Sequence, residues 1–220
     1  MRGIIFDFNG TMFFDSDKHE KAWKEYIQKL AGRKVSEVEL KGRVHGRNNS
    51  DILEYFSGRK LTEKEVDEMG EEKESIYRKL CLEDKDNFKL VNGVEELLDY
   101  LKENKIPFTI ATASGRKNLE FYFEKLNLGK WFDFEKVVYN DGTIKGKPNP
   151  DIYLKAAKTI NVEPKNCIVI EDAKSGIEAA ERAGIGKIIA MASTSEPEYF
   201  NDIKSVSKVI TDFVNFKDYI

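Results

Sequence analysis

The sequence predicts an α/β fold: a doubly wound, mostly parallel sheet with a helical domain inserted after the first strand. Three observations predict it: an apolar strand at the start of the chain, a stretch over residues 15–88 with no strand-like run, and alternating helices and strands after it. Strands separated by helices pair in parallel through right-handed crossovers, so ligands gather at the carboxyl ends of the strands. We therefore assign residues 1–14 and 89–220 to an α/β core and residues 15–88 to a helical domain inserted into it.

The first strand is predicted over residues 3–8, where the run Gly-Ile-Ile-Phe-Asp-Phe stops at Asn9–Gly10. A buried strand that ends in a turn has this pattern, which places Asp7 near the end of the strand. The insert is predicted to be helical because two groups of apolar residues have helical spacing. These groups are Trp23, Tyr26, Ile27 and Leu30, and Met69, Ile76, Tyr77 and Leu80. Thr62 and Glu65 predict a capping box at the start of the helix that carries the second group.

Beyond residue 89 the pattern alternates between helices and strands. Helices are predicted over residues 94–101 and 119–126, and a third opens at Asn149–Pro150 and runs through residue 160. Further strands are predicted over residues 108–111, 137–138, 167–170, 187–191 and 206–210. This alternation is the basis for the predicted parallel sheet.

The composition excludes several classes of partner. The 220 residues include 36 Lys and Arg and 39 Asp and Glu, with a formal net charge of -3 and no long block of like charge. We therefore expect small molecules or proteins as partners, no nucleic acid, no membrane, and a monomer or weak dimer. Cys81 and Cys167 form no CxxC pair, and Asp7 interrupts the first apolar run without a cleavage site after it. Both observations favour a cytoplasmic protein with reduced thiols.

Four polar segments stand where strands end or helices begin: residues 7–11, 111–115, 146–150 and 170–172. Each has an ordinary explanation. Asp7 could bind nearby amides, Thr112 and Ser114 could cap the next helix, Lys147 could be a surface lysine, and Glu171–Asp172 could be favoured by a helix dipole. The occurrence of all four segments in this order is much less probable by chance than the occurrence of any one of them.

The four segments resemble the motifs of the haloacid dehalogenase superfamily, which has a Rossmann-like core, and the likeness runs from Gly3 to about Ala190. The first family motif reads Asp-x-Asp-Gly-Thr, and Asp7, Gly10 and Thr11 stand in its places. The resemblance implies a phosphohydrolase in which Asp7 attacks phosphorus and forms an aspartyl phosphate. It implies these further roles: Thr112, Ser114, Ala113, Gly10 and Thr11 contact the phosphorylated substrate, Lys147 offsets charge, and Asp172 with Glu171 binds Mg²⁺.

This chemistry has a physical requirement that the residues can meet. A phosphoryl group brings two negative charges towards Asp7, itself an anion, so attack needs cations and hydrogen-bond donors. Lys147 and Mg²⁺ would supply the positive charge. Magnesium prefers about six oxygen ligands and keeps several waters. Asp7, the main-chain carbonyl of Asn9 and Asp172 would be the protein's share of these ligands.

The helical insert is similar to the cap of a subgroup that includes β-phosphoglucomutase-like enzymes. His19 and Trp23 fall where this subgroup often has His and Trp, and Gly46–Arg47 with residues 51–53 looks like its substrate-contacting loop. The resemblance implies that His19, Gly46 and Arg47 contact the substrate. An ordinary helix residue at His19 and a surface cation at Arg47 are the alternatives.

Asn9 departs from the family pattern, in which a second aspartate protonates the leaving group and later activates water. An amide cannot transfer protons in this way. General acid–base catalysis typically contributes a factor of about 10² to 10⁴ to the rate, which would be lost. Three explanations remain open. Asn9 could be an introduced substitution, it could be natural, or the protein could only bind a phosphorylated ligand. If Asn9 is natural, either His19 or Glu20 takes the role of the acid or the leaving group needs no proton.

The leading hypothesis is a magnesium-dependent phosphatase acting on a small phosphorylated metabolite. The alternatives are a β-phosphoglucomutase-like sugar-phosphate mutase, a catalytically silent protein that binds a phosphorylated ligand, and a phospho-signalling receiver. The long helical insert and the position of Asp7 in the first strand argue against a receiver.

Overall fold

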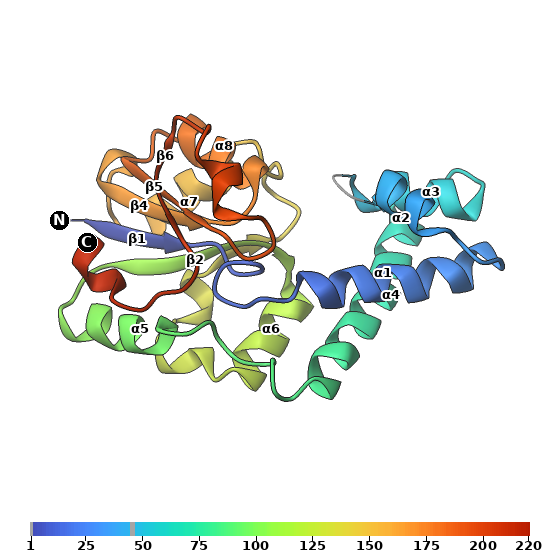
Figure 1. Cartoon of the computed structure of the whole chain (residues 1–220), viewed down its shortest axis with the longest axis horizontal. Helices are drawn as coiled ribbons and strands as arrows, with labels where there is room; N and C mark the ends of the chain where they lie inside the picture. The colour runs from blue at the N-terminus through green and yellow to red at the C-terminus, as the bar shows by residue number, and fades with distance from the viewer. Residues whose placement is uncertain (1, 45–46) are drawn as a thin grey trace. The chain divides into compact units, whose positions relative to one another are not determined.

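The computed structural model describes residues 2–44 and 47–220. The chain divides into two compact units (Figure 1). The core unit comprises Met1–Phe14 and Lys89–Ile220, and the helical unit comprises Asp15–Phe88. Gly46, predicted to contact the substrate, lies outside the described residues.

The core unit contains a six-stranded sheet in which every pair is parallel. The strand order is β3-β2-β1-β4-β5-β6. The strands are β1 (Gly3–Phe6), β2 (Phe108–Gly115), β3 (Val138–Asn140), β4 (Cys167–Glu171), β5 (Lys187–Met191) and β6 (Val206–Ile210). This order is that of a doubly wound sheet, so the predicted fold class is confirmed.

Helices cover both faces of the sheet because successive strand residues point to opposite sides. Ile5 of β1 belongs to a buried cluster with residues of α7 and α8 on one face. Phe6 contacts Phe213 of the C-terminal segment, with 5.9 Å between ring centroids, on the other face. There the C-terminal segment and its 3-10 helix η5 (Phe216–Tyr219) lie beside α5 (Figure 1). The core helices are α5 (Val94–Glu103), α6 (Arg116–Lys125), α7 (Asp151–Thr159) and α8 (Lys174–Arg182).

Several boundaries differ from the prediction: β2 continues to Gly115 instead of ending at residue 111, and α6 begins at Arg116 instead of residue 119. Two further differences concern the polar segments. The first strand ends at Phe6 instead of Phe8, because the chain turns there: the N–H groups of Thr11, Met12 and Phe13 all donate to the carbonyl of Phe8. Asn149 does not cap the third predicted helix. Its side-chain Nδ2 donates to the carbonyl of Gly146, and Pro150 occupies the N-cap position of α7.

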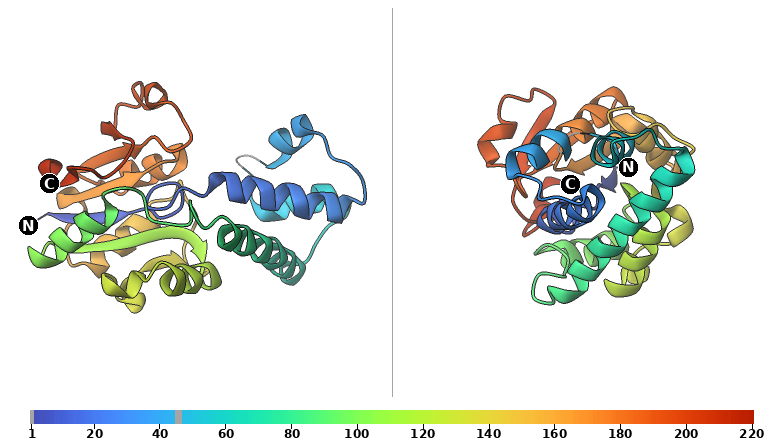
Figure 2. Two further views of the ribbon diagram at one scale, coloured as in Figure 1. Left: turned by 60° about the horizontal axis from the view of Figure 1, so that its bottom comes forward. Right: turned by 90° about the vertical axis from the view of Figure 1, so that its right-hand side faces the viewer.

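The helical unit consists of α1 (Ser16–Ala31), α2 (Glu37–Val44), α3 (Asn49–Ser57) and α4 (Glu63–Glu83). The long helices α1 and α4 pack against each other, and α3 contacts both (Figure 2). Their shared apolar cluster includes Trp23, Ile27 and Leu53. The predicted capping box is confirmed, because Thr62 Oγ1 accepts from the Glu65 N–H and Glu65 Oε2 accepts from the Thr62 N–H.

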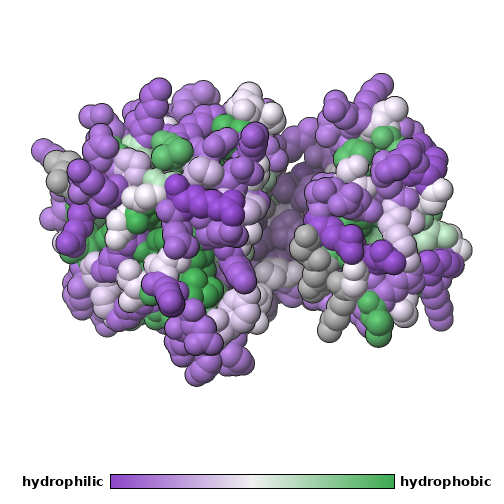
Figure 3. Space-filling view, turned by 90° about the horizontal axis from the view of Figure 1, so that it is seen from above, coloured by the Kyte–Doolittle hydropathy of each residue, from purple (hydrophilic) through white to green (hydrophobic). Residues whose placement is uncertain are grey.

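Hydrophilic side chains predominate on the face of each unit that Figure 3 shows, with smaller apolar areas among them. Within the described part of the chain, no helix has both the length and the apolar character needed to cross a membrane.

Candidate active site

The parallel sheet brings three of the four polar segments to one edge. Phe6 of β1 is in register with Ile110 of β2 and Ile170 of β4. Residues 7, 112–114 and 171–172 therefore follow at the carboxyl ends of three adjacent strands. The Asp7 N–H donates to the carbonyl of Ile170 at 3.0 Å, which fixes the backbone of Asp7 beside β4.

Lys147, from the fourth segment, joins two of these strand ends. Its Nζ lies 2.6 Å from Asp7 Oδ1 and 2.5 Å from Glu171 Oε1. Burial acts to lower the pKa of Lys147, but the charges of Asp7 and Glu171 outweigh it and hold the pKa well above its usual value. Lys147 is thus a largely buried cation between two carboxylates, with a side chain only 9% exposed, and the interpretation as a surface lysine is wrong.

Glu171 is fixed by several donors and is only 1% exposed. Besides Lys147, the Tyr153 hydroxyl donates to Oε1 at 3.0 Å and the Ala173 N–H donates to Oε2 at 2.8 Å. Gly176 of α8 permits this geometry, since a Cβ there would collide with Oε1. These contacts favour a role for Glu171 in holding Lys147 in place.

Asp172 lies beside two other acids. Asp7, Glu171 and Asp172 each offer a carboxylate oxygen, and these oxygens lie within 4.8 Å of one another. Burial and then the charges of Asp7 and Glu171 raise the pKa of Asp172 to about 8. Gly10, at φ 74°, lets the turn pass so close to Asp172 that a Cβ would collide with Oδ2. Crowded carboxylate oxygens of this kind fit a hard divalent cation, which would offset their mutual repulsion.

Asn9 is held by hydroxyl groups from β2 and α6. Its Nδ2 donates to the Tyr122 hydroxyl at 2.8 Å. Its Oδ1 accepts from Ser114 Oγ at 2.7 Å and from Thr112 Oγ1 at 3.3 Å. Thr112 and Ser114 are therefore bound to Asn9, in the turn that follows β1. The alternative that they cap the next helix is wrong, because Gly115 is the N-cap residue of α6.

Two further predicted residues lie at the same edge. Thr11 is fully buried, and its Oγ1 has no hydrogen-bond partner among the residues that the structure describes. Ala113 is exposed near the end of β2, between Thr112 and Ser114. Six of the predicted residues thus come together at the sheet edge through direct hydrogen bonds: Asp7, Lys147 and Glu171 in one group, and Asn9, Thr112 and Ser114 in another.

The predicted cap residues belong to the helical unit. The His19 ring stacks on Tyr77 at a centroid distance of 3.8 Å. His19 Nδ1 lies 2.9 Å from Lys73 Nζ, and Nε2 lies 3.5 Å from Asp15 Oδ2. Both ring nitrogens therefore have partners within this unit. Arg47 is exposed and lines a cavity of about 510 Å³ together with Arg43 and Arg59.

Sequence reasoning missed three residues that hold these groups: Tyr122, Tyr153 and Lys73. Tyr122 and Tyr153 are fully buried and read in the sequence as core aromatic residues of α6 and α7. Lys73 lies among charged residues of α4 and is only 3% exposed. A buried tyrosine needs a partner for its hydroxyl, but the sequence does not show which polar group is the partner.

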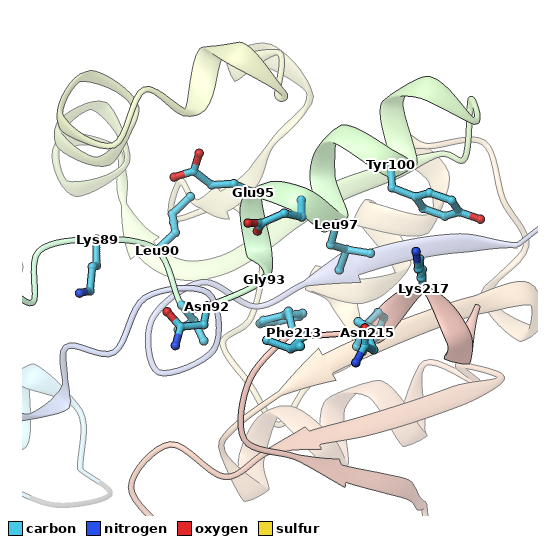
Figure 4. A pocket seen from close by; sticks show the side chains of 14 residues that line it. Lys89, Leu90, Asn92, Gly93, Glu95, Leu97, Tyr100, Phe213, Asn215 and Lys217 are labelled. Carbon is cyan, nitrogen blue, oxygen red and sulfur yellow. The ribbon is translucent and has the colours of Figure 1, made fainter.

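A cavity of about 830 Å³ lies elsewhere in the core unit, along the junction of α5 and the C-terminal segment (Figure 4). Leu97 and Tyr100 from α5 and Phe213 and Asn215 from the C-terminal segment line it. None of the residues predicted for the site is among those that line this cavity.

The parallel sheet places an aspartate, a largely buried lysine and two further acids at its strand ends. This arrangement is typical of a class of phosphoryl-transfer enzymes. The family model of the haloacid dehalogenase-like hydrolases matches residues 1–184. The chain belongs to this family, which excludes the receiver interpretation. It is a phosphatase or phosphoryl transferase of the haloacid dehalogenase superfamily.

Individual relatives agree with this family. The chain is 31% identical to the phosphorylated carbohydrates phosphatase of Thermotoga maritima, over 86% of this chain and 84% of the relative. It is 33% identical to the β-phosphoglucomutase of Bacillus subtilis, over 84% of this chain and 81% of the relative. A crystal structure of a HAD hydrolase, family IA, variant 3, from Entamoeba histolytica has a TM-score of 0.91 and 39% identity, and the match covers 98% of this chain and 95% of that one.

Proposed function

We propose that this enzyme is a magnesium-dependent phosphatase that acts on a small phosphorylated metabolite through an aspartyl phosphate at Asp7. One observation carries the proposal: Lys147 Nζ lies within 2.6 Å of a carboxylate oxygen of Asp7 and also contacts Glu171. A cation held there lowers the repulsion between Asp7 and an incoming phosphoryl group.

Each residue at the sheet edge has a different role in the proposed reaction. Asp7 attacks phosphorus, Lys147 stabilises the negative charge on both reactants, and Glu171 with Tyr153 keeps Lys147 in place. Thr112 and Ser114 lie at the end of the neighbouring strand, where their hydroxyls donate to Asn9 Oδ1 and can donate to a phosphoryl oxygen instead. Asp7, Asp172 and the Asn9 carbonyl would hold Mg²⁺, with Glu171 beside them. When bound, the ion would add positive charge that helps to offset the negative charge of the phosphoryl group.

A phosphorylated sugar is the favoured substrate. The relatives named as a phosphorylated carbohydrates phosphatase and as a β-phosphoglucomutase support this choice. We propose that His19, Gly46 and Arg47 contact the sugar or a second anionic group. The β-phosphoglucomutase relative also makes a mutase the second candidate, in which the phosphoryl group on Asp7 passes to another hydroxyl.

Phosphate release from a panel of sugar phosphates, measured with Mg²⁺, tests the proposal. The matched variants are Asn9→Asp and Asn166→Asp; the control residue is exposed just before β4, at the opposite edge of the sheet. Asn9→Asp should raise turnover about 10² to 10⁴-fold, and Asn166→Asp should leave it unchanged. No release by any of these proteins would contradict phosphatase activity. Sugar-phosphate interconversion without release would favour the mutase, and binding by calorimetry without any turnover would favour a silent binding protein.

A further inference from the structure

The side chain of Asn9 has partners that suit both ends of an amide. Nδ2 donates to the Tyr122 hydroxyl, and Oδ1 accepts from Ser114 and Thr112. Tyr122 is itself fixed, because it is fully buried and stacks on Phe8 with 4.6 Å between ring centroids. The amide is therefore integrated into the hydrogen bonding of the core unit.

This arrangement limits what position 9 can do in catalysis. An amide neither gives up nor takes a proton near neutral pH, and the hydroxyls around it are weak acids. The ionisable groups of the sheet edge have other roles: Lys147 bridges Asp7 and Glu171, and Asp172 would hold the proposed Mg²⁺ as a carboxylate, with no proton to give. Of the two acids considered as replacements, His19 has both ring nitrogens engaged by Lys73 and Asp15 in the helical unit, and Glu20 is exposed on the surface of α1. The described residues thus favour a reaction in which the leaving group departs without a proton.

We propose that this enzyme, with Asn9 in place, takes its phosphoryl group much faster from acyl phosphates than from the alkyl esters of sugar phosphates and stores it on Asp7, an inference that rests on the proposed aspartyl-phosphate chemistry. A carboxylate oxygen of Asp7 forms a bond to phosphorus as the bond from phosphorus to the acyl oxygen breaks. The acyl group leaves as a carboxylate with the bonding electron pair. A carboxylate is stable as an anion near neutral pH, so this step needs no general acid.

Hydrolysis of the stored group is the slower step. A water oxygen attacks phosphorus, the bond to Asp7 breaks, and Asp7 recovers its carboxylate while the water proton passes to the departing phosphate or to solvent. Asn9 cannot take that proton, and general-base help of this kind is typically worth about 10² to 10⁴ in rate. Phosphorylated Asp7 should therefore accumulate.

Leaving-group dependence tests this inference. Acetyl phosphate, p-nitrophenyl phosphate, phenyl phosphate and glucose 6-phosphate are compared by kcat/KM at constant Mg²⁺, in the unmodified enzyme, Asn9→Asp and Asn166→Asp. In the unmodified enzyme and Asn166→Asp, kcat/KM should fall steeply as the leaving group becomes more basic. Asn9→Asp should flatten the series by raising the value for glucose 6-phosphate roughly 10² to 10⁴-fold and leaving acetyl phosphate nearly unchanged.

A burst experiment measures storage. Mixing the unmodified enzyme with acetyl phosphate should release close to one acetate per enzyme before slow turnover, with the label of ³²P-acetyl phosphate retained on the protein. Asn9→Asp should remove the burst, and Asp7→Asn should show neither burst nor label. Equal kcat/KM for acyl and alkyl phosphates in the unmodified enzyme would overturn the inference and leave the proposed phosphatase standing. Absence of label and turnover in both the unmodified enzyme and Asn9→Asp would overturn the inference and the proposed function together.

Discussion

Lys147 of the core unit and Lys73 of the helical unit are both buried lysines, and their surroundings differ in kind. Lys147 lies between two buried carboxylates, Asp7 and Glu171. Lys73 contacts the partly exposed carboxylate of Glu74, the ring nitrogen of His19 and, at 5.1 Å, the face of Trp23. The first lysine neutralises charge where chemistry is proposed, whereas the second joins α1 to α4.

The difference teaches that burial of a lysine does not by itself mark a catalytic site. A buried cation is stable only if its partners replace the water it has lost. Two carboxylates over-compensate one ammonium, so the Lys147 site keeps negative charge for a further cation. Lys73 has one carboxylate, a ring nitrogen and an aromatic face as its partners, so its own contacts include fewer anions than those of Lys147.

Replacement of Lys147 should have the largest effect. In Lys147→Met, kcat/KM should fall roughly 10²- to 10³-fold or more, because the negative charge on Asp7 and the phosphoryl group loses its cation. The free energy of unfolding should also fall by about 3 to 5 kcal/mol, since two buried carboxylates are left facing each other. Steady-state kinetics and urea denaturation measure the two effects.

Adding Glu171→Gln to Lys147→Met provides the control for misfolding. The second change removes one uncompensated anion and should recover part of the stability without recovering activity. Recovery of activity along with stability would mean that Lys147 acts only through the fold.

The pH dependence of stability sharpens the view that the core site holds excess negative charge. Burial, Asp7 and Glu171 raise the pKa of Asp172 to about 8 in the folded state, well above its ordinary value of 3.8. The folded state therefore binds the proton more tightly, and the stability this provides is present below about pH 4 and lost as the pH rises through about 8. The loss should be of the order of a few kcal/mol.

Melting temperatures measured from about pH 5 to about pH 9, with EDTA or with Mg²⁺, check this expectation. Magnesium should reduce the loss because it favours the carboxylate form of Asp172, and Asp172→Asn should remove most of the pH dependence in EDTA. The melting temperature could instead change with pH by the same amount in the unmodified enzyme with EDTA, in the unmodified enzyme with Mg²⁺ and in Asp172→Asn. That result would mean that the acidic cluster binds no cation and does not titrate in this range.

Replacement of Lys73 tests the other half of the comparison. Lys73→Met keeps the length and apolar character of the side chain but removes the donor to His19 Nδ1 and the cation over Trp23. The hydrogen bond that is lost has a charged donor and is worth about 1.5 to 3 kcal/mol, so the free energy of unfolding should fall by about that amount. Urea denaturation beside Lys79→Met, an exposed lysine on the same helix, measures it. A loss as large as that of Lys147→Met would erase the distinction between the two lysines.

The sequence predicted the core site better than the helical unit for a physical reason. Asp7, Thr112 and Glu171 each follow a β-branched or apolar run in the sequence. Parallel pairing places the carboxyl ends of the strands at one edge, so short motifs far apart in the chain converge. Lys147 was recognised from its motif, but no pattern in the sequence showed that it is buried. The partners of Lys73 and Tyr122 depend on how helices rotate against their neighbours, and apolar spacing alone does not fix which polar atoms meet.

The smallest expected effect concerns the start of α4, where the helical unit is stabilised by a local motif without any buried charge. Thr62 and Glu65 exchange hydrogen bonds between side chain and backbone. Thr62→Ala removes the acceptor for the Glu65 N–H and should cost about 1 kcal/mol. Thr211→Ala, at an exposed position of the core unit, is the matched control and should change stability by less than about 0.5 kcal/mol. Equal stability of the two variants would mean that the capping box adds nothing measurable and that α4 is held by its packing against α1 and α3 alone. The contacts between α1 and α4, including those of Lys73, would then account for a larger share of the stability of the helical unit.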